Sequence, residues 1–144
     1  MAIADFRCIT RFRVPFCDVD MLQHVNNASY VVWAETAHCT YINDVLGESI
    51  GGANGIIIAK LTFDYEQPLD YREEVAVGCR IARIGRKSID FAYEIWSETR
   101  HERAAHGLTT MVAFDYKTKT SIVVPERWRE IIAVYEMVAP AVGS

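Results

Sequence analysis

The sequence predicts an α+β fold in which a five-stranded antiparallel sheet wraps around a long central helix, with a short helix near the C-terminus. Residues 27–46 carry apolar side chains at spacings of three and four, which is typical of a buried helix. Four segments between residues 59 and 116 alternate polar and apolar side chains and have short connections, which favours antiparallel pairing. One buried helix packed on one sheet is an α+β layer arrangement.

The first strand and the central helix are bounded by local signals. Residues 6–16 alternate in character, so a strand with one buried face is expected there. Asn26 or Asn27 then offers an N-cap for the helix. The helical spacing is expected to end near Leu46, where Gly47 is a stop signal.

The remaining elements follow at short intervals. A flexible loop is expected over residues 49–55 and a turn over residues 68–71. The first three of the four later strands have apolar faces made of Ala59, Leu61, Phe63 and Tyr65, then Val75, Val77, Cys79 and Ile81, then Ile89, Phe91, Tyr93 and Ile95. The strand over residues 104–116 places small residues on one face and large ones on the other, and Pro125 opens the last helix.

Length, composition and charge restrict the classes of function. The 144 residues are expected to form one domain, residues 1–144. A net charge of −4 argues against a nucleic-acid binder, which needs a basic face. We expect no membrane span and no signal peptide from the apolar pattern. The four scattered cysteines form no CxxC pair, which favours a reducing, cytoplasmic location and no metal site.

The segment from Asp18 to Tyr30 is the most informative part of the chain. It places Asp18, Asp20 and His24 directly before a helix start. A helix N-terminus carries free backbone N–H groups and a partial positive charge, so it can hold a developing oxyanion. An acid/base group beside such donors suits acyl-transfer chemistry.

The same segment resembles a known family. The matching motifs are Asp18-Val19-Asp20, Tyr30, Glu35, Gln67-Pro68-Leu69 and Gly85-Arg86-Lys87-Ser88. Together with the order of elements, they are similar to the hotdog-fold acyl-CoA thioesterases of the 4-hydroxybenzoyl-CoA thioesterase-like group. The segment from Asp18 through the run at residues 24–27 also resembles plant acyl-carrier-protein thioesterases, which place a functional Asn where this chain has Leu22.

The resemblance implies a catalytic group and a charge-stabilising donor. Asp20 matches the catalytic carboxylate of the family, and Asn27 matches its backbone oxyanion donor. His24 and Glu35 are candidate helpers in catalysis. Two structural alternatives stay open: His24 as a hydrogen-bonded loop residue, and Glu35 as a carboxylate that fixes the motif loop. Asp18 is interpreted as structural.

The resemblance also implies contacts to the substrate. Arg86 and Lys87 match a basic pair that contacts coenzyme A phosphates in some members, although a solvated turn is the alternative. Asn54 falls where the family lines its pocket.

The expected function is hydrolysis of an acyl-CoA thioester to a carboxylic acid and coenzyme A, without a cofactor. The alternatives are a dehydratase or hydratase on the same fold, with His24 and Glu35 as its pair, and a non-catalytic acyl-CoA-binding subunit. An open sheet edge invites pairing, and the family builds its sites between subunits, so a homodimer or homotetramer is expected.

Overall fold

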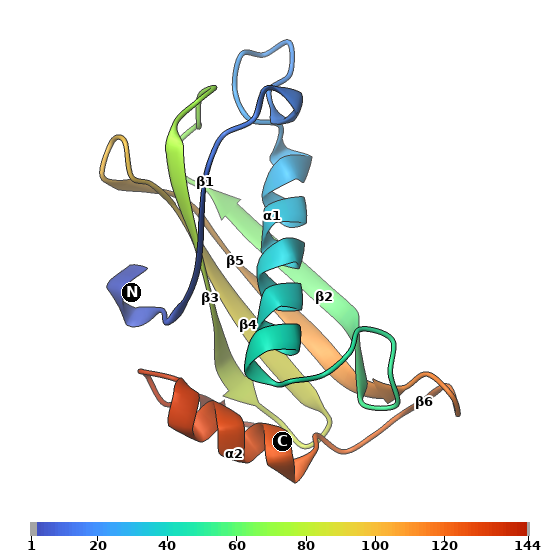
Figure 1. Ribbon diagram of the computed structural model, residues 1–144. Coiled ribbons are helices and arrows are strands. Elements are labelled where there is room, and N and C mark those ends of the chain that lie inside the picture. The colour runs from blue at the N-terminus through green and yellow to red at the C-terminus, as the bar shows by residue number, and fades with distance from the viewer. Residues whose placement is uncertain (1–2, 144) are drawn as a thin grey trace.

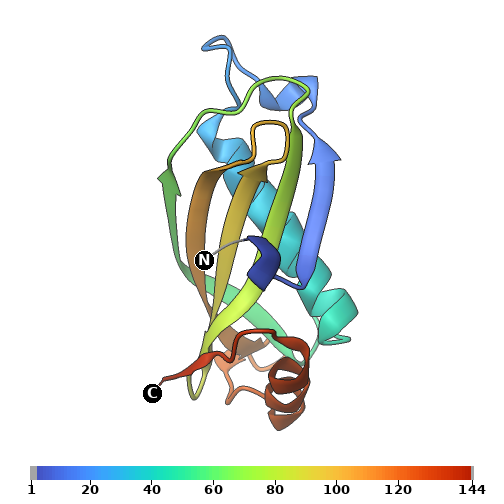
Figure 2. The same ribbon diagram turned by 90° about the vertical axis from the view of Figure 1, so that its left-hand side faces the viewer.

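The computed structural model describes residues 3–143 and has the expected architecture. Its five long strands run in the order β1-β3-β4-β5-β2, and all neighbours in this order are antiparallel. The sheet curls around the central helix α1 (Figures 1 and 2). The bounds are β1 Cys8–Arg13, β2 Gly55–Tyr65, β3 Glu74–Ile84, β4 Ser88–Ser97, β5 Glu102–Asp115 and α1 Asn27–Thr40. The predicted α+β class is therefore confirmed.

The C-terminal part adds more structure than the sequence indicated. The predicted short helix is α2 (Glu126–Tyr135), which lies across one end of the sheet (Figure 1). Two short strands flank it: β6 (Thr120–Ser121) pairs antiparallel with β5, and β7 (Ala141–Val142) pairs parallel with β3. Two-residue strands have no period to read, so alternation could not reveal them.

The first strand is shorter than predicted. β1 ends at Arg13, and the chain turns at Pro15 into a 3-10 turn, η2 (Phe16–Asp18). Because Pro15 has no backbone N–H, it cannot continue the ladder with β3. Phe16 is consequently 76% exposed and lies outside the buried face that the alternation predicted.

The central helix begins and ends close to the predicted residues. Asn26 is the N-cap, since its side-chain oxygen accepts the backbone N–H of Ala28 at 2.8 Å. After α1 the chain continues through a π-helical turn, η3 (Tyr41–Val45), to Leu46. Gly47 then adopts a φ of +68°, a left-handed conformation that suits glycine and terminates the helix.

The core lies between the concave face of the sheet and one side of α1. The apolar faces predicted for β3 and β4 are buried throughout. Cys8 and Cys79 are buried free thiols, as expected for small core residues. Burial raises the pKa of the Cys8 thiol to about 11, which keeps it protonated near neutral pH.

Strand β2 departs from the predicted pattern because it lies at the edge of the sheet. It pairs with β5 on one side, and no strand lies on its other side within residues 3–143. Ala59, Leu61 and Tyr65 are exposed, and Phe63 is only partly buried. The alternation is present, but the face it defines is largely uncovered in a single chain.

Stability is expected to depend on pH through His38. This side chain is buried, and its Nδ1 lies 2.9 Å from the Tyr93 hydroxyl. Desolvation lowers the pKa of His38 from 6.5 to about 4. As the pH falls from about 7 towards 4, His38 therefore becomes protonated in the unfolded chain but stays neutral in the folded chain. The free energy of unfolding decreases over that pH range.

Urea unfolding at pH 7 and pH 5 tests this dependence. The wild type should lose about 2 kcal/mol more stability between these pH values than a His38→Gln variant, because only the wild type carries this linkage. The comparison cancels the titration of other groups, such as Glu136, whose pKa burial raises. Equal losses in both proteins would assign the acid sensitivity to other residues.

Candidate active site

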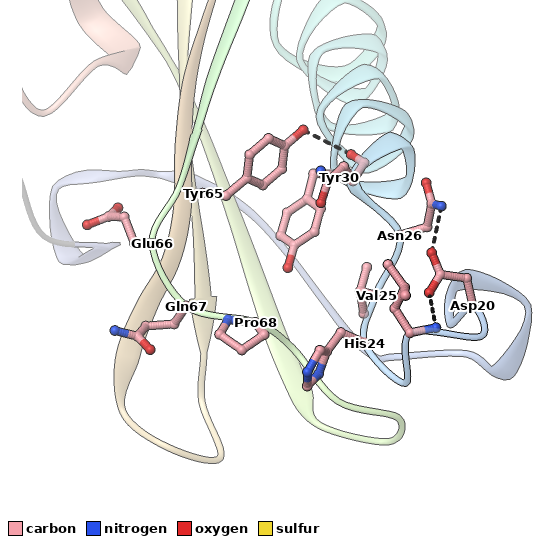
Figure 3. A pocket seen from close by; sticks show the side chains of 11 residues that line it. Asp20, His24, Val25, Asn26, Tyr30, Tyr65, Glu66, Gln67 and Pro68 are labelled. Carbon is pink, nitrogen blue, oxygen red and sulfur yellow. Dashed lines mark hydrogen bonds between the residues drawn. The ribbon is translucent and has the colours of Figure 1, made fainter.

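A pocket of about 390 Å³ opens at the N-terminus of α1. One wall is the motif loop with the first turn of the helix, including Asp20 and His24. The other wall is the end of β2 and the residues after it, 65–68. Figure 3 shows the two walls facing each other, with Tyr30 between them. The sequence motif therefore lines a cavity rather than a flat surface.

Asp18 anchors the motif loop to the helix. Its Oδ1 accepts the Ser29 hydroxyl and its Oδ2 accepts the Trp33 indole N–H, each at 3.0 Å. Its backbone carbonyl also accepts the N–H of Asn26 at 2.8 Å. Both carboxylate oxygens are thus directed at α1, which agrees with the structural role expected from the sequence.

Asp20 is held by two amide donors at the wall of the pocket. Its Oδ1 accepts the backbone N–H of Leu22 and its Oδ2 accepts the side-chain amide of Asn26, each at 2.8 Å. A carboxylate has about four acceptor positions, so each oxygen keeps a lone pair for water or substrate. The carboxylate is therefore fixed in place while retaining the capacity to act as a base or a nucleophile.

The start of α1 lines the same pocket as this carboxylate. Asn26 accepts hydrogen bonds from the backbone N–H groups of two residues in the first turn. Its side chain accepts from Ala28, and its carbonyl accepts from Ser29 at 2.9 Å. Of the first three helical N–H groups, that of Asn27 is the one Asn26 does not take up. Asn27 also lines the pocket, at the helix end where free N–H groups and the helix dipole favour negative charge.

His24 also lines the pocket, but its partner is a residue that the sequence did not single out. Its Nδ1 lies 2.9 Å from Oδ1 of Asp70, and the two side chains are 50% and 59% exposed. Glu35, the partner expected in the dehydratase alternative, lies on an exposed part of α1 about two turns beyond Asn27 and outside the pocket. Its charge acts instead on Cys39, whose thiol pKa is raised by burial and by Glu35.

The predicted substrate contacts lie at the opposite end of the sheet. Arg86 and Lys87 form the turn between β3 and β4, and Asn54 directly precedes β2. Lys87 Nζ is 3.5 Å from the Ser121 hydroxyl, and the carbonyl of Arg86 accepts the N–H of Val124, in the segment before α2, at 2.9 Å. Because β3 has 11 residues, this end lies roughly 33 Å from the Asp20 end. One chain does not bring these residues together with Asp20.

Residues 65–68, the second wall of the pocket, were not predicted as site residues, although residues 67–69 are part of the family resemblance. The Tyr65 hydroxyl donates to the carbonyl of Asn27 at 3.1 Å, and Val25 N–H donates to the carbonyl of Leu69 at 2.9 Å. These bonds tie the wall to the motif loop. Burial raises the pKa of Tyr30 to about 12, so its hydroxyl stays protonated inside the pocket.

Neither a membrane-spanning helix nor a metal-binding cluster is found within residues 3–143. None of the helices there has the length and apolar character needed to traverse a bilayer. No cluster of three or more His, Cys, Asp or Glu side chains in that range could hold a metal ion.

The thioesterase-like superfamily matches residues 14–138, which include every residue lining the pocket. The chain belongs to the thioesterase-like superfamily. It is similar to the long-chain acyl-CoA thioesterase FadM of Escherichia coli (strain K12). The two are 24% identical over 123 residues, which cover 84% of this chain and 93% of FadM.

Solved structures confirm the hotdog fold that the resemblance implied for this superfamily member. The PA5185 protein from Pseudomonas aeruginosa strain PAO1 is 24% identical, with a TM-score of 0.83 over 92% of this chain and 94% of that one. A thioesterase from Thermus thermophilus, solved with coenzyme A and Zn, is 28% identical, with a TM-score of 0.81 over 94% and 98% of the two chains.

Proposed function

We propose that the protein hydrolyses acyl-CoA thioesters in the pocket at the N-terminus of α1. The observation that carries this proposal is the carboxylate of Asp20, held by two amide donors in a pocket that the first residue of α1, Asn27, also lines. Thioester hydrolysis needs a group that activates or replaces water and a donor for the carbonyl oxygen, and this pocket has both. The acyl-CoA thioesterase activity named for FadM and the coenzyme A bound to the Thermus thermophilus relative support the substrate class.

The chemistry has two routes that use the same residues. Asp20 either takes a proton from water as a general base or attacks the thioester carbonyl and forms a mixed anhydride that water then cleaves. In both routes the carbonyl oxygen becomes negative and accepts the N–H of Asn27. General-base assistance is typically worth about 10²–10⁴-fold, and one well-placed oxyanion donor about 10²–10³-fold.

The alternatives are less well supported by the geometry. A dehydratase or hydratase would pair His24 with Glu35, but His24 pairs with Asp70 and Glu35 lies outside the pocket. A binding subunit would have no need for a carboxylate fixed beside a helix N-terminus.

We also infer a cytoplasmic location, because the four cysteines are free thiols.

A second copy of the chain would complete the site. β2 runs from the end that carries Asn54 to the end that carries the pocket, and its outer side is open. If two copies pair their β2 strands antiparallel about a twofold axis, the Asn54, Arg86 and Lys87 end of one copy lies beside the Asp20 end of the other. We therefore assign the expected substrate contacts to the partner subunit of a homodimer, with a dimer of dimers as the larger assembly.

Light scattering on the purified protein measures this assembly. We expect a mass of at least twice the 16.3 kDa of one chain, because an uncovered edge strand with exposed apolar side chains favours pairing. A fully active monomer would show that the edge is not used and that the predicted contacts have another role.

The basic turn gives a second test. Changing Arg86 and Lys87 together to Ala should raise KM for acyl-CoA about tenfold and leave kcat largely unchanged, because two exposed charge contacts contribute up to about 1 kcal/mol each. Phosphate contacts far from the thioester bond affect ground and transition states alike. An acyl-pantetheine substrate, which lacks the nucleotide, is the control and should not respond. Equal losses with both substrates would mean that the turn supports the fold.

The acyl group is best identified by experiment. Release of free thiol from short, long, branched and aromatic acyl-CoAs would be followed with a thiol reagent, and the ratio kcat/KM would rank them. An acyl-carrier-protein thioester should be included, because the motif loop resembles both classes of enzyme. Absence of thiol release from every member would contradict the proposed function.

A further inference from the structure

The pairing of His24 with Asp70 fixes which nitrogen of the imidazole faces the substrate. Ionised Asp70 can only accept a hydrogen bond, so Nδ1 of His24, 2.9 Å away, must carry the proton. Nε2 is then the nitrogen left for the pocket that His24 lines. A carboxylate that holds one ring nitrogen in this way sets both the tautomer and the orientation of the ring.

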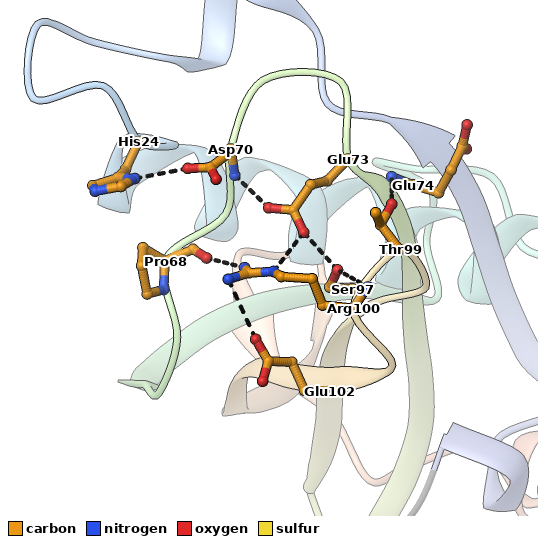
Figure 4. A network of polar contacts seen from close by, with 9 residues as sticks. All are labelled: His24, Pro68, Asp70, Glu73, Glu74, Ser97, Thr99, Arg100 and Glu102. Carbon is orange, nitrogen blue, oxygen red and sulfur yellow. Dashed lines mark hydrogen bonds and ion pairs between the residues drawn. The ribbon is translucent and has the colours of Figure 1, made fainter.

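The backbone of Asp70 is itself held from the interior. Its N–H donates to Oε2 of Glu73 at 2.6 Å, and Glu73 is only 7% exposed. The other oxygen of Glu73 accepts the Ser97 hydroxyl at 2.6 Å and Nε of Arg100 at 2.8 Å. This network of polar contacts is drawn in Figure 4.

Arg100 joins the network to the wall of the pocket. Its guanidinium donates to the carbonyl of Pro68, which lines the pocket, as well as to Glu73. The segment from residue 68 to residue 73 is thus held at both ends by one ion pair, in which Glu73 is buried and Arg100 is about a third exposed. The position of the Asp70 carboxylate is therefore a property of the folded sheet rather than of a free loop.

We propose that Asp70 is a positioning residue for His24, and that its role is to present Nε2 to the thioester. This inference rests on the proposed function. Hydrolysis forms a C–O bond from water, breaks the C–S bond and leaves a thiolate that needs a proton. Nε2 of neutral His24 takes up, through solvent, the proton that water loses to Asp20, and the imidazolium then gives a proton from Nε2 to the departing sulfur. Asp70 faces the positive charge that the imidazole carries in between.

Nuclear magnetic resonance of the ring nitrogens tests the positioning without any substrate. With ¹⁵N-histidine label, neutral His24 in the wild type should show a protonated Nδ1 and an unprotonated Nε2. The His24→Gln spectrum assigns the signals among the four histidines of the chain. In Asp70→Asn the Nδ1–H form should no longer dominate, because an amide can also donate to Nδ1. Unchanged His24 signals would overturn the proposal.

Kinetics test whether the positioning matters for turnover. Losing the carboxylate partner of a buried catalytic histidine costs about 10⁴ in kcat. Here the pair is half exposed, so Asp70→Asn should lower kcat about tenfold with KM nearly constant. Asp70→Glu should recover part of the loss. Glu74→Gln is the matched control, because Glu74 pairs with Arg13 away from the pocket and its loss should leave kcat unchanged.

The decisive comparison uses the double variant. If Asp70 acts through His24, then Asp70→Asn should cause no further loss of kcat in a His24→Gln background. An equal loss in both backgrounds would show that Asp70 supports the fold instead, and would overturn the proposal. If the wild type hydrolyses no thioester, the proposed function fails, while the resonance experiment still decides whether Asp70 positions His24.

Discussion

Replacing Asp20 with Asn is expected to lower kcat at least about 100-fold, because the amide can neither accept a proton from water nor attack the thioester. The shape of the side chain is kept. Its two neighbours, the N–H of Leu22 and the amide of Asn26, are both donors, and an amide has only one oxygen to offer them. One donor therefore loses its acceptor, which costs about 1 kcal/mol and leaves the fold intact.

Circular dichroism and thermal melting should accompany the rate measurement on Asp20→Asn. Asp64→Asn is the matched control, since it makes the same chemical change on β2 outside the pocket. A kcat for Asp20→Asn within threefold of the wild type would falsify the assignment of Asp20 as the catalytic carboxylate.

Replacing Glu73 with Ala is expected to have the largest effect on stability, about 3 kcal/mol. The change removes the acceptor of three donors: the Ser97 hydroxyl, the Arg100 guanidinium and the Asp70 N–H. A buried donor left without a partner costs about 1–3 kcal/mol. Ser97 is fully buried, whereas Arg100 is a third exposed and can turn to water, which limits the total.

The adjacent carboxylate provides the control for this prediction. Glu74 pairs with Arg13 at the surface, where such pairs contribute about 0–1 kcal/mol, so Glu74→Ala should change stability little. Urea unfolding of both variants measures the difference, and the melting temperature of Glu73→Ala should fall by about 6–12 °C. Similar stability losses in the two variants would mean that the buried network does not hold the turn.

Local patterns in the sequence predicted most of the fold. The alternation in β3 and β4 indicated the buried face residue by residue, and the cap at Asn26 and the stop at Gly47 bounded the helix. These elements depend on contacts between near neighbours or on one well-covered face. β2 has the same alternation but lies at an edge, and position in a sheet cannot be read from the period of one strand.

The candidate site also has residues that the sequence predicted and residues that it did not. The motif loop is local, so the sequence indicated Asp20, His24 and Asn27 together, and the structure places all three at one pocket. Asp70 contacts His24 from 46 residues away, through a pairing that only the folded sheet creates. Arg86 and Lys87 were joined to the site by resemblance alone, and a single chain keeps them at the far end of the sheet.

Product analysis on the best acyl-CoA tests the central claim most directly. The purified protein, the Asp20→Asn variant and a protein-free control would be incubated with the thioester, and free coenzyme A and free acid would both be quantified. We predict that the wild type releases the two products in equal amounts and that the variant stays close to the protein-free control. Conversion of the acyl chain without release of coenzyme A, or binding without any product, would contradict thioester hydrolysis at the Asp20 pocket.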